Sequence, residues 1–325
     1  MNEDHPLRAF APTSASAVQE TEMHGDQPTV SVVICTHKRP EFLRNCLDAV
    51  TNLQPPPSEL IVIDNTDGDG QTQAVAQEYA ARYIVEPRIG LSRARNRALL
   101  ESKSEIIAFL DDDAVPTPRW LNHLSTPFKE DRRVAAVTGS TTSSEGSECH
   151  IVMDPARSVD DGDEDWFVMA GFGGLGIGAN MALRKSACSE PGTFDERLGR
   201  GSILGGGEES EAFVKLLTRG YRIVHEPYAI VKHPDKPIDV EKEASRAIAY
   251  WLLLFFEFPD HRLDLLRFLL NRLRHKPLTW HRTSPNFGPI ITSGLGLRIR
   301  ACMAGVQLYF KARQESANSD LLAPL

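Results

Sequence analysis

The sequence has few of the features that mark a secreted, disulfide-bonded or membrane-spanning protein. Its five cysteines form no CxxC pair, and their odd number and wide spacing favour a reducing compartment over a disulfide framework or a zinc site. The longest apolar run, residues 249–258, is too short to cross a bilayer. Residues 1–28 have neither the positive start nor the apolar stretch of a signal peptide, so we expect a disordered lead-in and a cytoplasmic protein.

The chain also has no excess of positive charge. Its net charge of −8 argues against a general nucleic-acid-binding protein, which normally carries a basic surface. The charge is uneven, because residues 240–325 hold twelve lysines and arginines but only seven acidic residues. Segment 260–282 is basic and amphipathic. It is predicted either to pack on the rest of the protein as a helical subdomain or to lie peripherally on the inner face of an anionic membrane.

Short apolar runs alternate with longer amphipathic segments from Thr29 onward. This periodicity predicts strands at 30–36, 59–65, 83–86, 105–110 and 133–139, and helices that open at Pro40 and cover 71–82, 91–103 and 208–218. Strands that alternate with helices at this spacing predict an α/β fold with a mostly parallel sheet covered on both faces. From about Pro237 the composition changes to leucine-rich helical segments.

Polar side chains follow three of the predicted strands where each strand ends, at 36–39, 64–65 and 111–113. In sheets of this kind, ligands bind at the carboxyl ends of the strands. We therefore expect these three clusters to lie along one edge of the sheet and to form the functional site.

The most informative of these clusters is the triplet Asp111, Asp112 and Asp113. Asp111 and Asp113 occupy alternate positions beyond a strand end, so their carboxylates can point the same way and share one ligand. Like charges this close are costly unless a cation offsets them, and hard oxygen ligands suit Mg²⁺ or Mn²⁺ bound to a diphosphate. An acidic triplet by itself is more often a solvated turn or a helix cap. Its position at the end of a buried strand favours the metal site here.

An ordered series of motifs extends over about residues 30–235. It comprises SVVICTHKRPEFLRNCL, IVIDN, GLSRARNRAL, IIAFLDDDAVPTPRW, GANMALRKSA, GTFDERLGRG, GGGEESEAFVKLLTRGYRIVHEP and VKH. Together these motifs resemble the family 2 glycosyltransferases, which are inverting enzymes of the GT-A fold, a Rossmann-like mixed sheet with helices. The resemblance implies a GT-A catalytic domain at 29–236, with a nucleotide-sugar-binding half at 29–120 and an acceptor half at 121–236. The C-terminal helical region would cover 237–325.

The resemblance also implies a reaction. A sugar would pass from a nucleotide-diphosphate donor, usually a UDP-sugar, to a hydroxyl acceptor that is a glycan, a lipid-linked sugar or a small molecule. Such a reaction belongs to cell-surface glycan or glycolipid synthesis, and it would use Mn²⁺ or Mg²⁺ as cofactor.

The resemblance assigns donor-binding roles to individual residues. The implied contacts to the nucleotide are made by Thr36 and Arg39 in the first loop, Asp64 at the base, and Arg93 and Asn96 along the nucleotide pocket. Arg95 and Arg97, on the same helix as Arg93, are expected to lie on an exposed face with ordinary salt bridges.

For the metal region, the resemblance places Asp111 towards ribose and metal, and it makes Asp113 the ligand of the ion that bridges the two phosphates. Asp112 is counted with the donor-binding residues, although its side chain is expected to point away from the metal. His233, in the VKH motif, either completes the metal site or is a structural residue at a strand end.

The second chemical centre is the segment GGGEESEAF. Family members usually have Glu-Asp or Asp-Asp here, with the second acid as catalytic base. This chain has Glu208 and Glu209, which makes Glu209 the expected base and leaves Glu208 to hold the acceptor or orient the site. Glutamate adds one methylene of reach, so the reverse assignment stays open. The structural alternative is a helix N-terminus that carries acids to suit the helix dipole.

Two other functions are weighed against the transferase. A sugar-nucleotide nucleotidyltransferase would normally carry a glycine-rich phosphate loop after the first strand, where this chain has THKRP. A non-catalytic GT-A-like binding protein is supported only by the unusual Glu209. The intact Asp64, Asp111 and Asp113 favour the enzyme.

Overall fold

A computed structural model describes residues 28–143, 156–188, 193–234, 239–274 and 295–322. The predicted lead-in at 1–28 lies almost wholly outside these ranges. The strands are β1 (Val30–Thr36), β2 (Glu59–Asp64), β3 (Arg82–Val85), β4 (Ile106–Asp111), β5 (Val115–Pro116), β6 (Val134–Thr142), β7 (Arg157–Val159), β8 (Asn180–Arg184) and β9 (Arg222–Lys232). The α-helices are α1 (Pro40–Val50), α2 (Gly70–Glu78), α3 (Leu91–Glu101), α4 (Trp120–Glu130), α5 (Trp166–Gly171), α6 (Glu208–Thr218), α7 (Val240–Glu257), α8 (Arg262–Arg274) and α10 (Leu295–Leu322).

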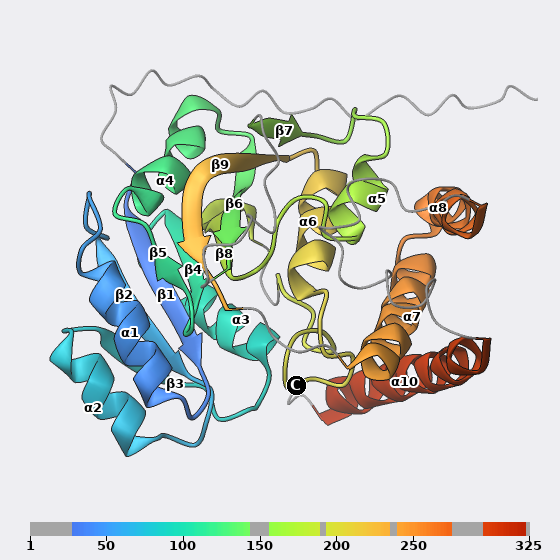
Figure 1. Cartoon of the computed structure of the whole chain (residues 1–325), viewed down its shortest axis with the longest axis horizontal. Helices are drawn as coiled ribbons and strands as arrows, with labels where there is room; N and C mark the ends of the chain where they lie inside the picture. Colours follow the sequence, from blue (N-terminus) through green and yellow to red (C-terminus); the bar gives the residue numbers. More distant parts are fainter. Residues whose placement is uncertain (1–27, 144–155, 189–192, 235–238, 275–294, 323–325) are drawn as a thin grey trace, which may run out of the picture.

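The strands form one mixed sheet in the order β3-β2-β1-β4-β8-β6-β9-β5, with β7 paired to β9 (Figure 1). The first four strands in this order are parallel to one another. Strand β8 then runs antiparallel between β4 and β6, and β6 and β9 are parallel again. The predicted α/β class is confirmed, and the parallel part of the sheet is the part that the N-terminal motifs build.

Both faces of the sheet are covered by helices. Side chains alternate across a strand, so Val32 and Ile34 of β1 join the buried cluster beneath α1, α2 and α4. Val33 joins the opposite cluster with α3, α5, α6 and α7. These three side chains are 0 % exposed, and burial on both faces explains why β1 is a continuous apolar run in place of an alternating pattern.

Two segments differ from the prediction. The helix expected at 71–82 ends at Glu78, because the chain turns at Ala80, whose φ is 52°, and enters β3 at Arg82. Helix α4 is absent from the predicted elements, since the regular periodicity of the sequence weakens after Trp120. Pro127 lies in the last turns of the helix, and α4 is held by a buried apolar face that includes Trp120 and Leu124.

Strand β9 is a single element although Pro227 interrupts its motif. Its pairing with β6 shifts register between Gly139 and Ser140, so that Glu226 and Ile230 pair with consecutive β6 residues. The residues between them, including Pro227, are left out of the ladder, where the missing N–H of proline has no cost. This bulge lets β9 continue to Lys232 and places His233 at the end of the strand.

The C-terminal helices α7, α8 and α10 lie together on the side of the molecule opposite α1 and α2 (Figure 1). Phe268 of α8 stacks on Phe172 with ring centroids 4.5 Å apart, and α10 lies close against Ser245 and Ile248 of α7 at Gly305. The expected C-terminal helical region is thus present and packs on the α/β core. In the described parts of the chain, every helix is too short or too polar to cross a membrane.

Helix α6 buries the acidic side chain of Glu211, which is only 3 % exposed and pairs with Lys215 at 2.6 Å. Its Oε2 atom has no hydrogen-bond partner among the described residues. Burial raises the pKa of Glu211 to about 7, against an ordinary value of 4.5. The unfolded chain releases this proton at lower pH than the folded chain does, so this group destabilises the fold as the pH rises from about 4.5 towards 7.

We therefore expect Glu211→Gln to stabilise the protein at pH 8 relative to pH 5. Between pH 5 and pH 8, the free energy of unfolding of the variant relative to that of wild type should increase by roughly 1–3 kcal/mol. The reason is that glutamate ionises more readily in the unfolded chain, whereas glutamine has no proton to lose. Urea unfolding at the two pH values measures it. An equal difference in unfolding free energy at pH 5 and pH 8 would contradict the assignment.

Candidate active site

The three predicted polar clusters lie next to one another along one edge of the sheet. In the register of the parallel strands, Thr36 at the end of β1 is paired with Asp64 at the end of β2. On the other side of β1, Cys35 is paired with Asp111 at the end of β4. The convergence expected from the strand ends is confirmed.

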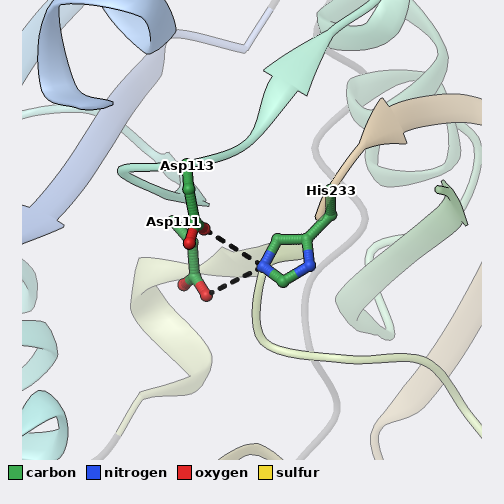
Figure 2. Close-up of side chains that lie close together, drawn as sticks. All are labelled: Asp111, Asp113 and His233. Atoms are coloured by element: carbon green, nitrogen blue, oxygen red, sulfur yellow. Dashed lines mark ion pairs between the residues drawn. The ribbon is translucent and has the colours of Figure 1, made fainter. Parts of the chain in front are cut away.

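Asp111, Asp113 and His233 form a compact group at this edge (Figure 2). The Nε2 atom of His233 lies 3.5 Å from Asp111 Oδ2 and 3.2 Å from Asp113 Oδ1. One ligand atom from each residue lies within 4.8 Å of the others. His233 is thus brought to the two carboxylates by the end of β9, far away in sequence.

The chemistry of this group fits a small divalent cation. The side chain of Asp113 is 0 % exposed, and a buried carboxylate next to a second one needs positive charge close by. Burial lowers the pKa of His233, but the carboxylates of Asp111 and Asp113 outweigh burial and raise it to about 9. The protonated imidazole of His233 then supplies part of the positive charge that the two carboxylates need. After His233 loses this proton, its imidazole nitrogen and the two carboxylate oxygens form a ligand set that Mn²⁺ accepts.

Asp112 points away from this group, as expected. It accepts hydrogen bonds from Thr36 Oγ1 at 2.8 Å and from Arg39 Nη1 at 2.6 Å. The second arm of the Arg39 guanidinium reaches Asp113 Oδ2 at 2.8 Å. Burial raises the pKa of Asp112 to about 6, with Thr36 and Arg39 acting against it. These contacts tie the loop after β1 to the aspartate triplet.

A cavity of about 540 Å³ lies between the loops that follow β1 and β2. His37 and Lys38 line one side, and Thr66, Gly68 and Ile89 are among the residues that line the rest. Its size is sufficient for a nucleoside.

Asp64, the predicted contact to the base, is fully buried and is absent from the residues that line this cavity. Its carboxylate accepts hydrogen bonds from Thr66 Oγ1, the Asp69 backbone N–H and the Tyr83 hydroxyl, at 2.8, 2.8 and 2.5 Å. In this structure Asp64 therefore fixes the loop that forms the cavity wall.

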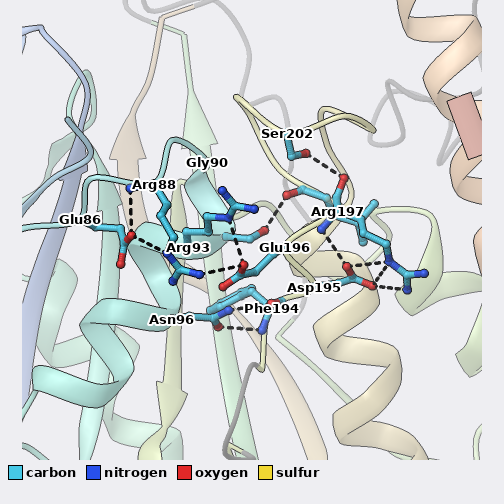
Figure 3. Close-up of polar contacts among 12 residues, drawn as sticks. Glu86, Arg88, Gly90, Arg93, Asn96, Phe194, Asp195, Glu196, Arg197 and Ser202 are labelled. Atoms are coloured by element: carbon cyan, nitrogen blue, oxygen red, sulfur yellow. Dashed lines mark hydrogen bonds and ion pairs between the residues drawn. The ribbon is translucent and has the colours of Figure 1, made fainter. Parts of the chain in front are cut away.

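Arg93 and Asn96 contact protein groups on the segment before α6 (Figure 3). The amide of Asn96 donates to the Phe194 carbonyl at 2.8 Å and accepts from its N–H at 3.0 Å. Arg93 Nε lies 3.0 Å from Glu196 Oε2, and Arg88 reaches the same oxygen at 3.5 Å. Both predicted donor residues thus dock segment 194–202 against α3, and neither lines the cavity.

The expectation that Arg95 lies on an exposed helical face is wrong. Its side chain is 2 % exposed, and Nη1 donates to Glu208 Oε1 at 2.7 Å while Nη2 donates to the Gly178 carbonyl at 3.0 Å. Nη2 also lies 3.6 Å from Asp111 Oδ1. Arg97, by contrast, is 41 % exposed and pairs with Glu101 at 2.8 Å, as expected for a surface position.

The burial of Arg95 could have been predicted from the helical periodicity of the sequence. Ala98 and Leu99, three and four residues further along α3, are buried, so Arg95 lies on the same face of the helix as these core positions. The prediction of an exposed side chain gave more weight to the charge of arginine than to this periodicity.

The acid pair stands at the start of α6, directly after Gly207, whose φ of 84° suits glycine. Glu208 is paired with Arg95, whereas no ion pair joins Glu209 to any described residue. Burial and, next, the charge of Glu208 raise the pKa of Glu209 to about 8, although Arg95 opposes the shift. Glu209 is thus a carboxyl group that can take up and release a proton near neutral pH.

The sequence is similar to those of known glycosyltransferases. Residues 31–190 match the profile of glycosyl transferase family 2. The glycosyltransferase AglE of Haloferax volcanii is 36 % identical over 102 residues, which are 29 % of this chain and 33 % of that protein. The succinoglycan biosynthesis protein ExoM of Rhizobium meliloti is 27 % identical over 216 residues, 63 % of this chain and 66 % of ExoM. The chain spans about one third to two thirds of the length of these relatives.

Solved structures show the same fold. The crystal structure of TarS from S. aureus matches with a TM-score of 0.59 at 15 % identity, over 86 % of this chain and 49 % of TarS. The mannosyltransferase PcManGT from Pyrobaculum calidifontis, solved in complex with GDP-Man and Mn²⁺, matches with a TM-score of 0.50 at 17 % identity. That match covers 92 % of this chain and 77 % of the other.

Proposed function

Because this chain belongs to glycosyl transferase family 2 and has the GT-A fold, we propose that it is an inverting glycosyltransferase that uses a nucleotide-diphosphate sugar and a divalent cation. The donor is a UDP-sugar in this proposal, and the acceptor is a hydroxyl group of a growing cell-surface glycan or glycolipid. In this proposal residues 29–236 are the catalytic domain and residues 237–325 a C-terminal region, whose described helices α7, α8 and α10 pack on the core.

The observation that carries the proposal is the group Asp111, Asp113 and His233, which lies at the same edge of the sheet as the β1 and β2 loops that line the cavity. These three residues would hold Mn²⁺ or Mg²⁺, which supplies Lewis-acid stabilisation to the departing nucleoside diphosphate. The nucleoside would occupy the cavity, where His37 and Lys38 supply polar and positive groups. Arg39 holds Asp112 and Asp113 through ion pairs of 2.6 and 2.8 Å.

Glu209 is the better candidate for the catalytic base. A base needs a free carboxylate, and Glu208 is engaged by Arg95 at 2.7 Å. The pKa of Glu209, raised to about 8, makes its ionised form a stronger base than an ordinary carboxylate, and the fraction in that form grows as the pH rises through 8. The acceptor oxygen then attacks the anomeric carbon as the bond to the diphosphate breaks, and the configuration at that carbon inverts.

The family match disfavours the nucleotidyltransferase alternative. The non-catalytic alternative is tested by turnover. We propose to incubate the protein with a panel of UDP-, GDP- and dTDP-sugars and Mn²⁺, and to follow release of the nucleoside diphosphate and binding by thermal shift. We expect one donor to be turned over in a metal-dependent reaction. Binding without turnover, with any donor and a range of hydroxyl acceptors, would support a binding protein.

We also propose that α8, which lies within segment 260–282, rests on an anionic membrane surface when the acceptor is lipid-linked. Residues 275–282 of that segment lie outside the described ranges. Leu265 and Phe268 of α8 pack on the core, whereas Leu263, Leu266 and Leu270 are exposed on it, together with Arg267. An exposed apolar face next to basic residues suits the lipid interface.

The variant Leu263→Asp/Leu270→Asp should therefore bind liposomes that contain anionic lipid at least about tenfold more weakly than wild type, because each buried leucine is worth roughly 1.5–3 kcal/mol. Co-sedimentation measures this, with nucleoside diphosphate release as a check that the catalytic domain is intact. Binding that does not change with anionic lipid content would remove the membrane proposal and leave α8 as a packed helix alone.

A further inference from the structure

Arg95 joins the two chemical centres of the site. It projects from α3 and contacts Glu208 at the start of α6, the Gly178 carbonyl before β8, and Asp111 at the end of β4. Asp111 belongs to the candidate metal group, and Glu208 precedes the candidate base. One guanidinium thus contacts both the candidate metal group and the acid pair that contains the candidate base.

The surroundings of Arg95 hold the guanidinium in one place. The rings of Phe109 and Phe194 lie with their centroids 5.9 and 5.6 Å from its Cζ atom. Gly178 allows its close approach, because a Cβ atom at position 178 would lie 2.6 Å from Nη2. Asn96 further fixes Phe194 through the two hydrogen bonds to its backbone.

Stabilisation of the fold alone does not explain why an arginine is buried at position 95. Burying an arginine carries a large desolvation penalty, and apolar side chains of similar volume often stabilise a protein as well as a buried ion pair does. The planar guanidinium, however, offers several donors in a rigid geometry, which makes it suited to hold separate groups at a fixed spacing. The contacts of Arg95 go to residues of both centres and to the backbone between them.

We propose that Arg95 is a positioning residue that ties the Asp111 carboxylate to the Glu208–Glu209 acid pair and so sets the distance between donor and base. The inference rests on the proposed function for its kinetic consequence. It does not assign Arg95 a contact with substrate.

Arg95→Met is the direct test, with Arg97→Met on the exposed face of the same helix as the matched control. In Arg95→Met, kcat with the active nucleotide sugar should fall about 100-fold or more, while the donor KM changes less than about fivefold, because misplaced catalytic groups affect the chemical step first. Arg95→Lys should recover part of kcat, since one ammonium cannot hold all three partners. Arg97→Met should match wild type.

The second readout is independent of activity. The EPR spectrum of bound Mn²⁺ should change in Arg95→Met, because Asp111 loses one of the groups that orient it, and should stay the same in Arg97→Met. If the wild type turns over no nucleotide sugar, the proposed function fails, while this spectrum still tests Arg95. An unchanged Mn²⁺ spectrum, or an unchanged kcat in an active enzyme, would overturn the inference.

Gly178→Ala covers the case in which Arg95→Met does not fold. The added methyl group keeps the charge of Arg95 but displaces the guanidinium, which is the flexible end of its side chain. We expect a folded protein with an altered Mn²⁺ spectrum and a kcat lowered about tenfold or more. A Gly178→Ala protein with the kcat and the Mn²⁺ spectrum of wild type would overturn the inference.

Discussion

Glu209→Gln is expected to lower kcat by about 10³-fold, within the range that a general base contributes, and to leave donor binding almost unchanged. Glutamine keeps the size of the side chain but cannot take the proton of the acceptor hydroxyl. Release of nucleoside diphosphate under saturating donor measures kcat, and thermal shift with donor and Mn²⁺ shows whether binding is kept.

The pH profile separates Glu209 from Glu208. Because the base must be ionised and the pKa of Glu209 is raised to about 8, the wild-type rate should increase as the pH rises from 6 through 8 and level off above it. Glu209→Gln should lose this dependence. Glu208→Gln, which leaves Arg95 without its closest partner, should lower kcat but keep the rise with pH. A lost pH dependence in Glu208→Gln and a retained one in Glu209→Gln would make Glu208 the base.

Asp113→Asn is expected to weaken Mn²⁺ binding by at least about 100-fold, because loss of an outer-shell partner alone typically costs 10–100-fold. The amide removes one negative charge from a site whose Asp113 side chain is 0 % exposed. Binding of UDP that depends on Mn²⁺ should be lost with it. Isothermal titration with Mn²⁺ alone, and then with UDP in its presence, measures both effects.

Asp112→Asn is the matched control for this variant. It makes the same chemical change one residue away, where the carboxylate faces Thr36 and Arg39 in place of His233. This variant should retain most of the affinity for Mn²⁺. If Asp113→Asn binds UDP with unchanged metal dependence, Asp113 does not hold the metal.

The sheet edge was predictable from the sequence because strand ends and buried apolar runs are local signals. The helix at 208–218 and the strand at 30–36 have the predicted bounds, and both follow from periodicity and terminal residues. Helix α4 was missed because the periodicity of the sequence weakens after Trp120, whereas the burial of Trp120 and Leu124 decides the structure. That burial is a tertiary effect.

The side-chain contacts of the site were less predictable. The donor contacts that the family resemblance implies for Asp64 and Asn96 stay predictions, whereas the hydrogen bonds of these two residues to protein groups were not predicted. Arg95 was placed on the surface because an arginine in a helix usually is exposed, yet its partners Glu208 and Gly178 are 113 and 83 residues away in sequence. Only the fold brings them together.

The most direct test of the central claim is nucleoside diphosphate release from the nucleotide sugar that the panel identifies, measured with Mn²⁺, after EDTA and after Mn²⁺ is restored. We predict that EDTA abolishes release, that Mn²⁺ restores it in the wild type, and that Asp113→Asn shows no restoration. Release that continues in EDTA, or that Mn²⁺ restores equally in Asp113→Asn, would contradict a metal-held donor at Asp111, Asp113 and His233.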